Sequence, residues 1–305
     1  MTYEEKLTNF NAHIADGGKI EAETWMPDDY RMGVLKFIEM HANSEIMGAL
    51  PERECLPQAP TLQRKMSLAA KIQDEVGHSQ LLYRVAEDLG KSRDAMLADL
   101  VNGRSKFHNV FHYPVKHWGD VALIGWLIDG AALVTQAALL DSSYAPYTRV
   151  LKRICTEEQL HLRHGEDITL ELASGTDAQR EMFQEALNRW WLAIIHFFGP
   201  RSNVEKDLLL RWKVKTRTNE DLRQEFLDRY VPKILELGFT LPTPIPHQSG
   251  DHYLIDEADI DWAPLDSIKK NDGPETARRL GKRKRIYDEH RWVREALAGP
   301  AVHAA

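Results

Sequence analysis

Apolar residues recur along the first two thirds of the chain at alternating spacings of three and four, which is the periodicity of α-helices. Strand-like alternation bounded by turn residues is nearly absent there. Asp28 and Thr61 are suitable helix caps, and Pro51 is expected to end the first helix. The pattern predicts four long helices, over residues 28–49, 61–90, 118–142 and 146–175.

Each predicted helix carries an acidic residue on the face that its apolar residues turn toward the core: Glu45, Glu75, Asp129 and Glu158. On the first helix, Glu45 continues the stripe formed by Val34 and Ile38. A buried carboxylate without a partner is costly, so four of them on inward faces require compensating cations. The pattern therefore indicates a charged site inside the bundle.

Two of these acids begin a Glu-x-x-His motif, as Glu75-Val-Gly-His78 and Glu158-Gln-Leu-His161. Residues i and i+3 of a helix project side by side, so each motif offers a carboxylate and an imidazole to one metal ion. Ferritin-like di-iron proteins combine two such pairs with one carboxylate from each of two further helices. Glu45 precedes Glu75 by 30 residues and Asp129 precedes Glu158 by 29, so the two halves of the chain match.

Asp120 is the competing acid on the third helix. It lies nine residues before Asp129, about 180° around a helix of 3.6 residues per turn, so both cannot face inward. Oxygen-rich ligation with two imidazoles favours iron or manganese over structural zinc. We therefore predict an all-α, ferritin-like four-helix bundle with two iron ions on Glu45, Glu75, His78, Asp129, Glu158 and His161.

Two polar residues lie one helical turn before predicted ligands. Lys71 precedes Glu75 and either reaches the carboxylates or lies in solvent. His41 precedes Glu45 and is either a hydrogen-bond partner of a ligand or a core histidine.

Other chemically active side chains do not fit the ligand pattern. Glu157 and His164 flank the fourth-helix pair and are not expected to bind metal. His108, His112 and His117 lie in a loop without helical ligand spacing, which argues against a second metal site. An aromatic group is expected to pack in the core, with a substrate wall as the alternative: Trp190, Trp191, Phe197 and Phe198.

Beyond the four helices, residues 177–240 predict further helices interrupted at Gly199-Pro200. Residues 241–275 are rich in Pro, Gly and Asp and predict an extended arm, and a charged helix is expected over 275–298. We expect one domain over 1–305, divided into a four-helix core (28–175), additional helices (176–240), and an arm with a terminal helix (241–305).

Composition narrows the class of protein. The chain has 305 residues, of which 43% are hydrophobic, enough for a substantial core. A net charge of -7 argues against a nucleic-acid binder, although the basic stretch Arg278 to Arg285 can serve a local purpose. Two cysteines without a CxxC motif support neither disulfides nor a zinc knuckle. With a polar, acidic N-terminus that does not resemble a signal sequence, we expect a cytoplasmic protein.

The stretch Val121 to Leu140 is mostly apolar and about as long as a membrane span. Asp129 lies at its middle, and a carboxylate at bilayer depth is costly. No second span accompanies it, so we expect a helix buried in the protein core and no membrane partner.

Segments across nearly the whole chain resemble the catalytic A subunits of the phenylacetyl-coenzyme A ring 1,2-epoxidases, a family of multicomponent bacterial monooxygenases. These segments are Trp25-Met-Pro-Asp-Asp-Tyr-Arg31, His41-Ala-Asn-Ser-Glu-Ile46, Gln73-Asp-Glu-Val-Gly-His78, Trp126-Leu-Ile-Asp-Gly-Ala131, Phe198-Gly-Pro200 and Trp292-Val-Arg-Glu-Ala296. The resemblance implies that the six residues predicted above are the iron ligands.

The resemblance also implies an activity. A reduced di-iron centre would use O2 to form a ring 1,2-epoxide on phenylacetyl-CoA in aerobic phenylacetate degradation. Electrons would come from NADPH through a separate flavin and iron-sulfur reductase, because this chain has neither a Gly-rich dinucleotide fingerprint nor cluster cysteines. Further expected partners are a ligand-poor structural homologue of the same fold and a small bridging subunit.

Substrate contacts follow partly from charge and partly from the resemblance. Coenzyme A carries phosphates, so basic side chains are expected near the mouth of the site. Candidates are Lys36, Lys106 and Lys213. By resemblance, the substrate-contacting positions also include Met40, the loop residues Phe107, His108 and Asn109, and His196. Leu133 stands where toluene and methane monooxygenases carry a threonine, which implies a different handling of oxygen.

Two alternatives share the same bundle. An iron-storage relative would need only a compact four-helix chain that assembles into a shell, and the long segment 177–305 argues against it. A purely structural subunit would have no use for all six ligands.

Overall fold

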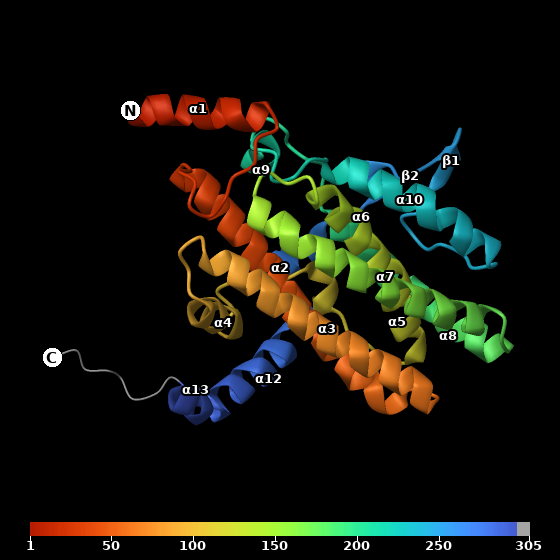
Figure 1. Cartoon of the computed structure of the whole chain (residues 1–305). Helices are drawn as coiled ribbons and strands as arrows, with labels where there is room; N and C mark the ends of the chain where they lie inside the picture. Colours follow the sequence, from red (N-terminus) through yellow and green to blue (C-terminus); the bar gives the residue numbers. More distant parts are fainter. Residues whose placement is uncertain (298–305) are drawn as a thin grey trace.

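A computed structural model describes residues 1–297 as a mainly helical protein, which confirms the predicted all-α class (Figure 1). The long helices are α1 (Tyr3–Ala15), α2 (Asp28–Cys55), α3 (Leu62–Glu87), α6 (Asp129–Leu139), α7 (Ala145–Ala173), α8 (Asp177–Ile195), α10 (Asn219–Glu236) and α12 (Thr276–Glu289). The shorter ones are α4 (Arg93–Val101), α5 (Trp118–Leu123), α9 (Leu208–Arg211), α11 (Ala263–Lys269) and α13 (Arg291–Leu297). Positions 298–305 of the predicted C-terminal segment lie outside the described residues.

Four helical rods form the bundle that the sequence predicts. α2 packs along α3, while α7 packs along the rod made of α5 and α6 and also contacts α3 (Figure 1). α8 covers α5, and α10 covers α6. A short antiparallel hairpin, β1 (His247–Ser249) and β2 (His252–Leu254), packs on α10.

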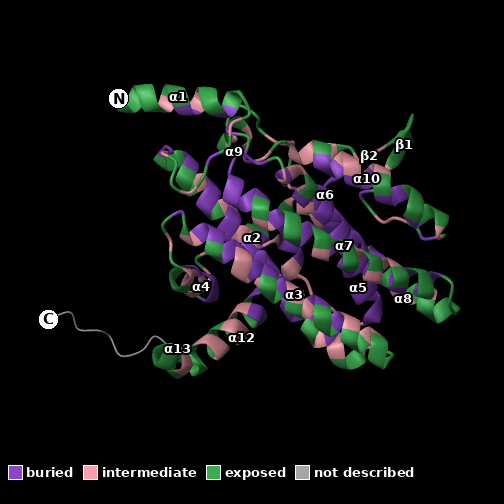
Figure 2. Cartoon of the chain, viewed as in Figure 1, coloured by how far each residue is buried: buried purple, intermediate pink, exposed green. Residues whose placement is uncertain are grey.

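The apolar core is divided by a polar layer, which explains why acids interrupt the apolar stripes. Along α7, Ile154 belongs to one hydrophobic cluster and Ile168 to another. Along α3, Leu82 and Leu68 are divided between the same two clusters. Glu75, His78, Glu158 and His161 lie between these clusters and are buried, in the interior of the bundle (Figure 2). Apolar packing on both sides therefore holds the charged layer in place.

The third rod is not a uniform helix, contrary to the predicted helix over 118–142. Residues Ile124–Ile128 form a π-helical segment between α5 and α6. Such segments insert an extra residue into an α-helix and change the phase of the turns beyond it. Here the rod also meets α7 at very short range, because a Cβ placed on Gly165 would lie 2.0 Å from the carbonyl carbon of Gly125.

The prediction that Pro51 ends the first long helix was wrong, since α2 continues to Cys55. Proline lacks the N–H that would bond to Met47 one turn earlier. Tertiary packing outweighs this loss, because Pro51, Glu52 and Cys55 are all buried.

The segment predicted as an extended arm, 241–275, contains the hairpin and α11. α1 and α4 are additional helices that the periodicity did not predict. Within the described residues one helical stretch, Trp118–Leu139, is long and apolar enough to cross a membrane, and 78% of its most apolar window is buried inside the protein. This burial is what a core helix requires.

Candidate metal centre

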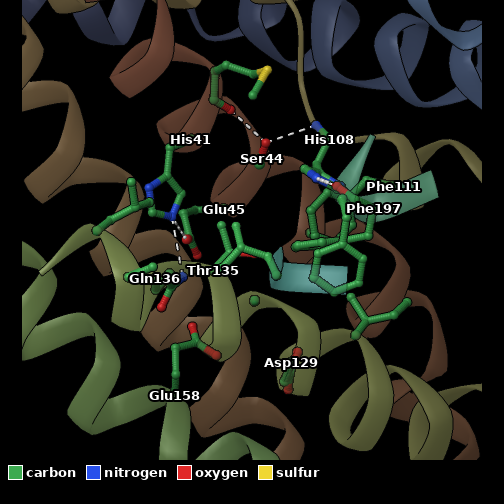
Figure 3. A pocket seen from close by; sticks show the side chains of 18 of the residues that line it. His41, Ser44, Glu45, His108, Phe111, Asp129, Thr135, Gln136, Glu158 and Phe197 are labelled. Atoms are coloured by element: carbon green, nitrogen blue, oxygen red, sulfur yellow. Dashed lines mark hydrogen bonds and ion pairs between the residues drawn. The ribbon is translucent and has the colours of Figure 1, made fainter. Parts of the chain in front are cut away.

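The six predicted ligands come together in the polar layer of the bundle. All are buried, with between 1% and 8% of their surface exposed. They form two groups whose ligand atoms lie within 4.8 Å of one another: Glu45, Glu75, His78 and Glu158, and Asp129, Glu158 and His161. Glu158 belongs to both groups. Figure 3 shows the carboxylates of Glu45, Glu158 and Asp129 around one shared space.

Both histidines direct Nδ1 into this space. Nδ1 of His78 lies 3.2 Å from one Glu158 oxygen and 3.6 Å from Glu45. Nδ1 of His161 lies 3.2 Å from the other Glu158 oxygen and 3.7 Å from Glu75. Two imidazole nitrogens and four carboxylates can thus hold two divalent cations with Glu158 between them.

The outer nitrogen of each histidine is held by an acid from the opposite helix. Nε2 of His78 lies 2.8 Å from Glu157 on α7, and Nε2 of His161 lies 3.1 Å from Asp74 on α3. Such contacts fix the tautomer and orientation of a metal-binding histidine. The sequence contained a signal for them that we did not use, because an acid directly precedes the glutamate of both motifs.

The carboxylates and histidines differ strongly in proton affinity. Burial alone would lower the pKa of His78, but the nearby carboxylates of Glu158 and Glu45 raise it to about 10. Burial raises the pKa of Asp129 to about 7, although the Lys71 ammonium opposes this shift. Burial and the charge of Glu158 raise the pKa of Glu75 well above its usual range. Protons therefore neutralise part of the cluster wherever divalent cations do not.

One observation tests directly whether a metal suits these residues. Nδ1 of His78 is buried without a hydrogen-bond partner among the described residues, although two carboxylates face it. A buried, unpaired polar atom is costly, and a cation between His78 and these carboxylates would satisfy it. The donor set therefore fits a metal ion.

Lys71 reaches the carboxylates rather than solvent. Its Nζ lies 2.5 Å from Asp129 and 2.5 Å from Glu52, and 3.9 Å from Glu75. Glu52 was not predicted to take part, because the first helix was expected to end before it. The ammonium contributes one positive charge to a layer that is otherwise rich in buried acids.

His41 contacts a predicted ligand. Its Nε2 lies 2.8 Å from Glu45, and its Nδ1 lies 2.7 Å from the Tyr147 hydroxyl. Burial would raise the pKa of Glu45, but the nearby imidazoles of His41 and His78 hold it well below its usual range. Glu45 is thus kept ionised in the orientation that ligation needs.

A cavity of about 280 Å³ opens next to the charged layer. Its walls are mainly apolar and include Ile124, Ile128, Phe111 and Phe197, and the carboxylates lie along one side (Figure 3). Thr216 lines the cavity and is itself exposed to solvent, so the cavity opens to the surface near this residue. Apolar walls beside a few converging polar groups are typical of small-molecule sites.

The predicted substrate contacts lie in different places. Met40 and His108 line the cavity, whereas Phe107, Asn109 and His196 are buried and do not. Lys36, Lys106 and Lys213 lie at the surface, and Lys213 donates to the Ala15 carbonyl. The side chains that line the cavity instead include Lys215 and Arg217. The substrate role of the whole set stays a prediction.

The other acids and histidines, which were not predicted as metal ligands, form contacts elsewhere in the structure. Asp120 is buried and accepts hydrogen bonds from Arg189 and Trp190. His112 bonds to Thr276, and His117 is the N-cap of α5. None of these belongs to either group of ligand atoms. Of the aromatic group, Trp190 and Trp191 pack in the core, and Phe197 and Phe198 line the cavity.

Removing the outer acids is expected to weaken iron binding. Asp74→Ala or Glu157→Ala should lower Fe(II) affinity roughly 10- to 100-fold, because His161 or His78 loses the contact that orients it. Anaerobic titration against a competing chelator measures this. Gln73→Ala, an exposed neighbour on α3, is the matched control. Affinities within twofold of the parent in both acid variants would contradict the assigned role.

Comparison with known proteins agrees with the segments singled out in the sequence. Residues 2–292 match the phenylacetic acid catabolic protein family. The chain is also 42% identical, over 99% of its length and 97% of the relative's, to the A subunit of the 1,2-phenylacetyl-CoA epoxidase of Escherichia coli (strain K12). Both matches include the bundle, the cavity walls and most of the C-terminal segment. The chain therefore belongs to the phenylacetic acid catabolic protein family.

Proposed function

We propose that this chain is the oxygen-activating subunit of a phenylacetyl-CoA 1,2-epoxidase in aerobic phenylacetate degradation. The observation that carries the proposal is a buried cluster of carboxylates and histidines beside an apolar cavity, in a chain related over nearly its full length to such a subunit. The relative's name marks it as part of a multi-subunit enzyme. We infer that this chain likewise works with a structural homologue, an NADPH-dependent flavin and iron-sulfur reductase, and a small bridging subunit.

The proposed iron ligands are the two groups described above. Glu45, Glu75 and His78 would hold one iron, Asp129 and His161 the other, with Glu158 between them. When bound and reduced, two irons would supply the redox chemistry that puts one oxygen atom of O2 into the ring and releases the other as water, with NADPH as the source of the two electrons. Iron rather than zinc suits the redox chemistry and the oxygen-rich donor set.

The cavity supports the choice of an aromatic acyl group. An apolar cavity of about 150 Å³ is large enough for benzene, so about 280 Å³ accommodates the phenylacetyl group and the start of the thioester arm. Phe111 and Phe197 would orient the ring toward the carboxylate side and exclude water from it. The rest of coenzyme A would lie outside the cavity.

The proposed exit for the coenzyme A arm is the end of the cavity near Thr216. Lys215 and Arg217 flank this residue and can attract phosphates. Both already pair with acids, Lys215 with Asp207 and Arg217 with Glu225. A phosphate would therefore compete with these acids, and the more exposed Lys36 and Lys106 remain candidates for the same task.

A reconstituted complex tests the proposal. With its partner subunits and reductase, the chain is expected to convert phenylacetyl-CoA to a ring epoxide that carries one atom of 18O from 18O2, in proportion to NADPH consumed. The complex lacking this chain is the control. Fewer than one iron per chain after anaerobic loading, or no binding of phenylacetyl-CoA, would refute the proposal. A closed shell of many copies in solution would favour iron storage instead.

A further inference from the structure

The basic stretch Arg278 to Arg285, which the proposed chemistry does not use, lies on α12 next to the cavity wall. α12 contacts α4 and α2, and Thr276 and Arg279 near its first turns are buried. Arg279 has no exposed surface and no ion pair within residues 1–297. Burying a guanidinium is costly, and burial lowers the pKa of Arg279 to about 10. Its presence there therefore needs a structural reason.

Arg279 donates all its side-chain hydrogen bonds to one short segment. Its guanidinium bonds to the carbonyl oxygens of Phe111 and, at 2.7 Å, Tyr113. At the same end of α12, Thr276 lies 2.5 Å from His112 Nδ1, and the Glu275 N–H donates to the His112 carbonyl at 2.9 Å. Three consecutive residues, 111–113, are thus tied to the beginning of one helix.

The segment 105–113, here called the wall segment, forms one side of the cavity through His108 and Phe111. Its first half is held by the bundle: the His108 N–H donates to Ser44 on α2 at 2.9 Å, and Asn109 donates to the Ala193 carbonyl on α8 at 2.8 Å. Phe111 packs on Gly48, where an added Cβ would lie 2.9 Å from the ring. Besides hydrogen bonds within the segment itself, the second half takes its polar contacts from the beginning of α12.

α12 is itself fastened to the part of α2 that carries Glu45. Arg283 donates to the carbonyl oxygen of Ile46, the residue after Glu45. Arg278 and Lys282 pair with Glu54 near the end of α2. Leu280 packs on a small hydrophobic cluster that includes Met47, Leu50 and Phe107. The helix therefore spans from α2 to the wall segment and can transmit the position of one to the other.

We propose that α12 is a brace that positions the wall segment through Arg279, and so sets the shape of the cavity that receives the acyl group. Arg279 is a positioning residue, because it contacts the wall segment and does not line the cavity. The statement that this cavity receives the acyl group rests on the proposed function. Hydrogen bonds from a charged donor to the carbonyl groups of Phe111 and Tyr113 explain why arginine, rather than an apolar residue, occupies this buried position.

Arg279→Met tests the brace, because methionine retains much of the buried volume and removes every donor. In the complete complex, the Phe111 and Tyr113 amides are expected to exchange hydrogen at least roughly tenfold faster. KM for phenylacetyl-CoA should rise roughly tenfold while kcat and iron content change less than about twofold. Arg285→Ala is the matched control, since Arg285 is exposed on the same helix and faces Glu289 of α12 rather than α2 or the wall segment.

Parent-like exchange in the wall segment of Arg279→Met would overturn the brace, and so would faster exchange with an unchanged KM. If Arg279→Met does not fold, Thr276→Val decides. It removes the bond to His112, together with the one that Thr276 accepts from the Gly273 N–H, and should still speed exchange at residues 111–113. In Arg279→Lys the rate of amide exchange at residues 111–113 should lie between the rates of the parent and of Arg279→Met, because lysine can reach fewer carbonyl oxygens. A parent that fails to bind phenylacetyl-CoA would refute the proposed function, and amide exchange alone would then decide the brace.

Discussion

Glu158→Ala is expected to abolish epoxidation, lowering turnover at least about a thousandfold, and to leave fewer than one iron per chain. Glu158 belongs to both groups of ligand atoms, and its two oxygens each lie 3.2 Å from Nδ1 of a different histidine. The hydrogen bond from His161 and the nearby imidazole of His78 overcome the effect of burial and lower the pKa of Glu158 to about 2. The residue is therefore an ionised carboxylate in a position where it could contact both of the proposed cations.

Iron analysis after anaerobic loading and turnover in the reconstituted complex measure the effect of Glu158→Ala. Asp167→Ala is the control, because Asp167 is an exposed acid on the same helix. Circular dichroism separates loss of metal from loss of fold. A Glu158→Ala variant that retains two irons per chain, or parent-like turnover, would show that the cluster is not the reaction centre.

Gly165→Ala is expected to give the largest loss of stability, about 3 kcal/mol, and to lower Tm by roughly 6 to 12 °C. The added Cβ would lie 2.0 Å from the carbonyl carbon of Gly125, so backbone atoms of two rods must separate. Gly165 is one turn after His161, and Gly125 is one turn before Asp129. The same separation should therefore move Asp129 away from His161 and weaken iron binding by the group of Asp129, Glu158 and His161.

Thermal unfolding followed by circular dichroism measures this effect. Gly77→Ala is the matched control, because Gly77 is an exposed glycine inside α3 with open space around its Cα. Alanine there should stabilise the helix by about 0.5 to 1 kcal/mol. Equal melting temperatures for parent and Gly165→Ala would mean that the close approach of the two rods does not limit stability.

The six candidate ligands were accessible to sequence reasoning because their signal is local. A helix places residues i and i+3 side by side whatever surrounds it, so Glu75 with His78 and Glu158 with His161 could be paired from spacing. The acids that orient these histidines were not found. Asp74 and Glu157 act across the gap between α3 and α7, and their partners depend on how far each helix is rotated about its axis.

The cavity was harder to predict than the cluster. Met40 and His108 were among the expected substrate contacts and line it, but Lys215 and Arg217 at its exposed end were not expected. The segment that carries these two residues lies far along the chain from the bundle helices it closes against. Charge alone suggested Lys36, Lys106 and Lys213, but it could not distinguish a lysine that lines the cavity from one on the outer surface.

Helical periodicity and motif spacing were enough to establish the all-α fold and the inward-facing acids, because both follow from the geometry of a single helix. The continuation of α2 through Pro51, the burial of Lys71 and the bracing of the cavity wall by α12 became evident only in the folded chain. Lys71 meets Asp129 across 58 positions of sequence, and His112 meets Thr276 across 164. Such contacts depend on the packing of whole helices, which no local pattern encodes.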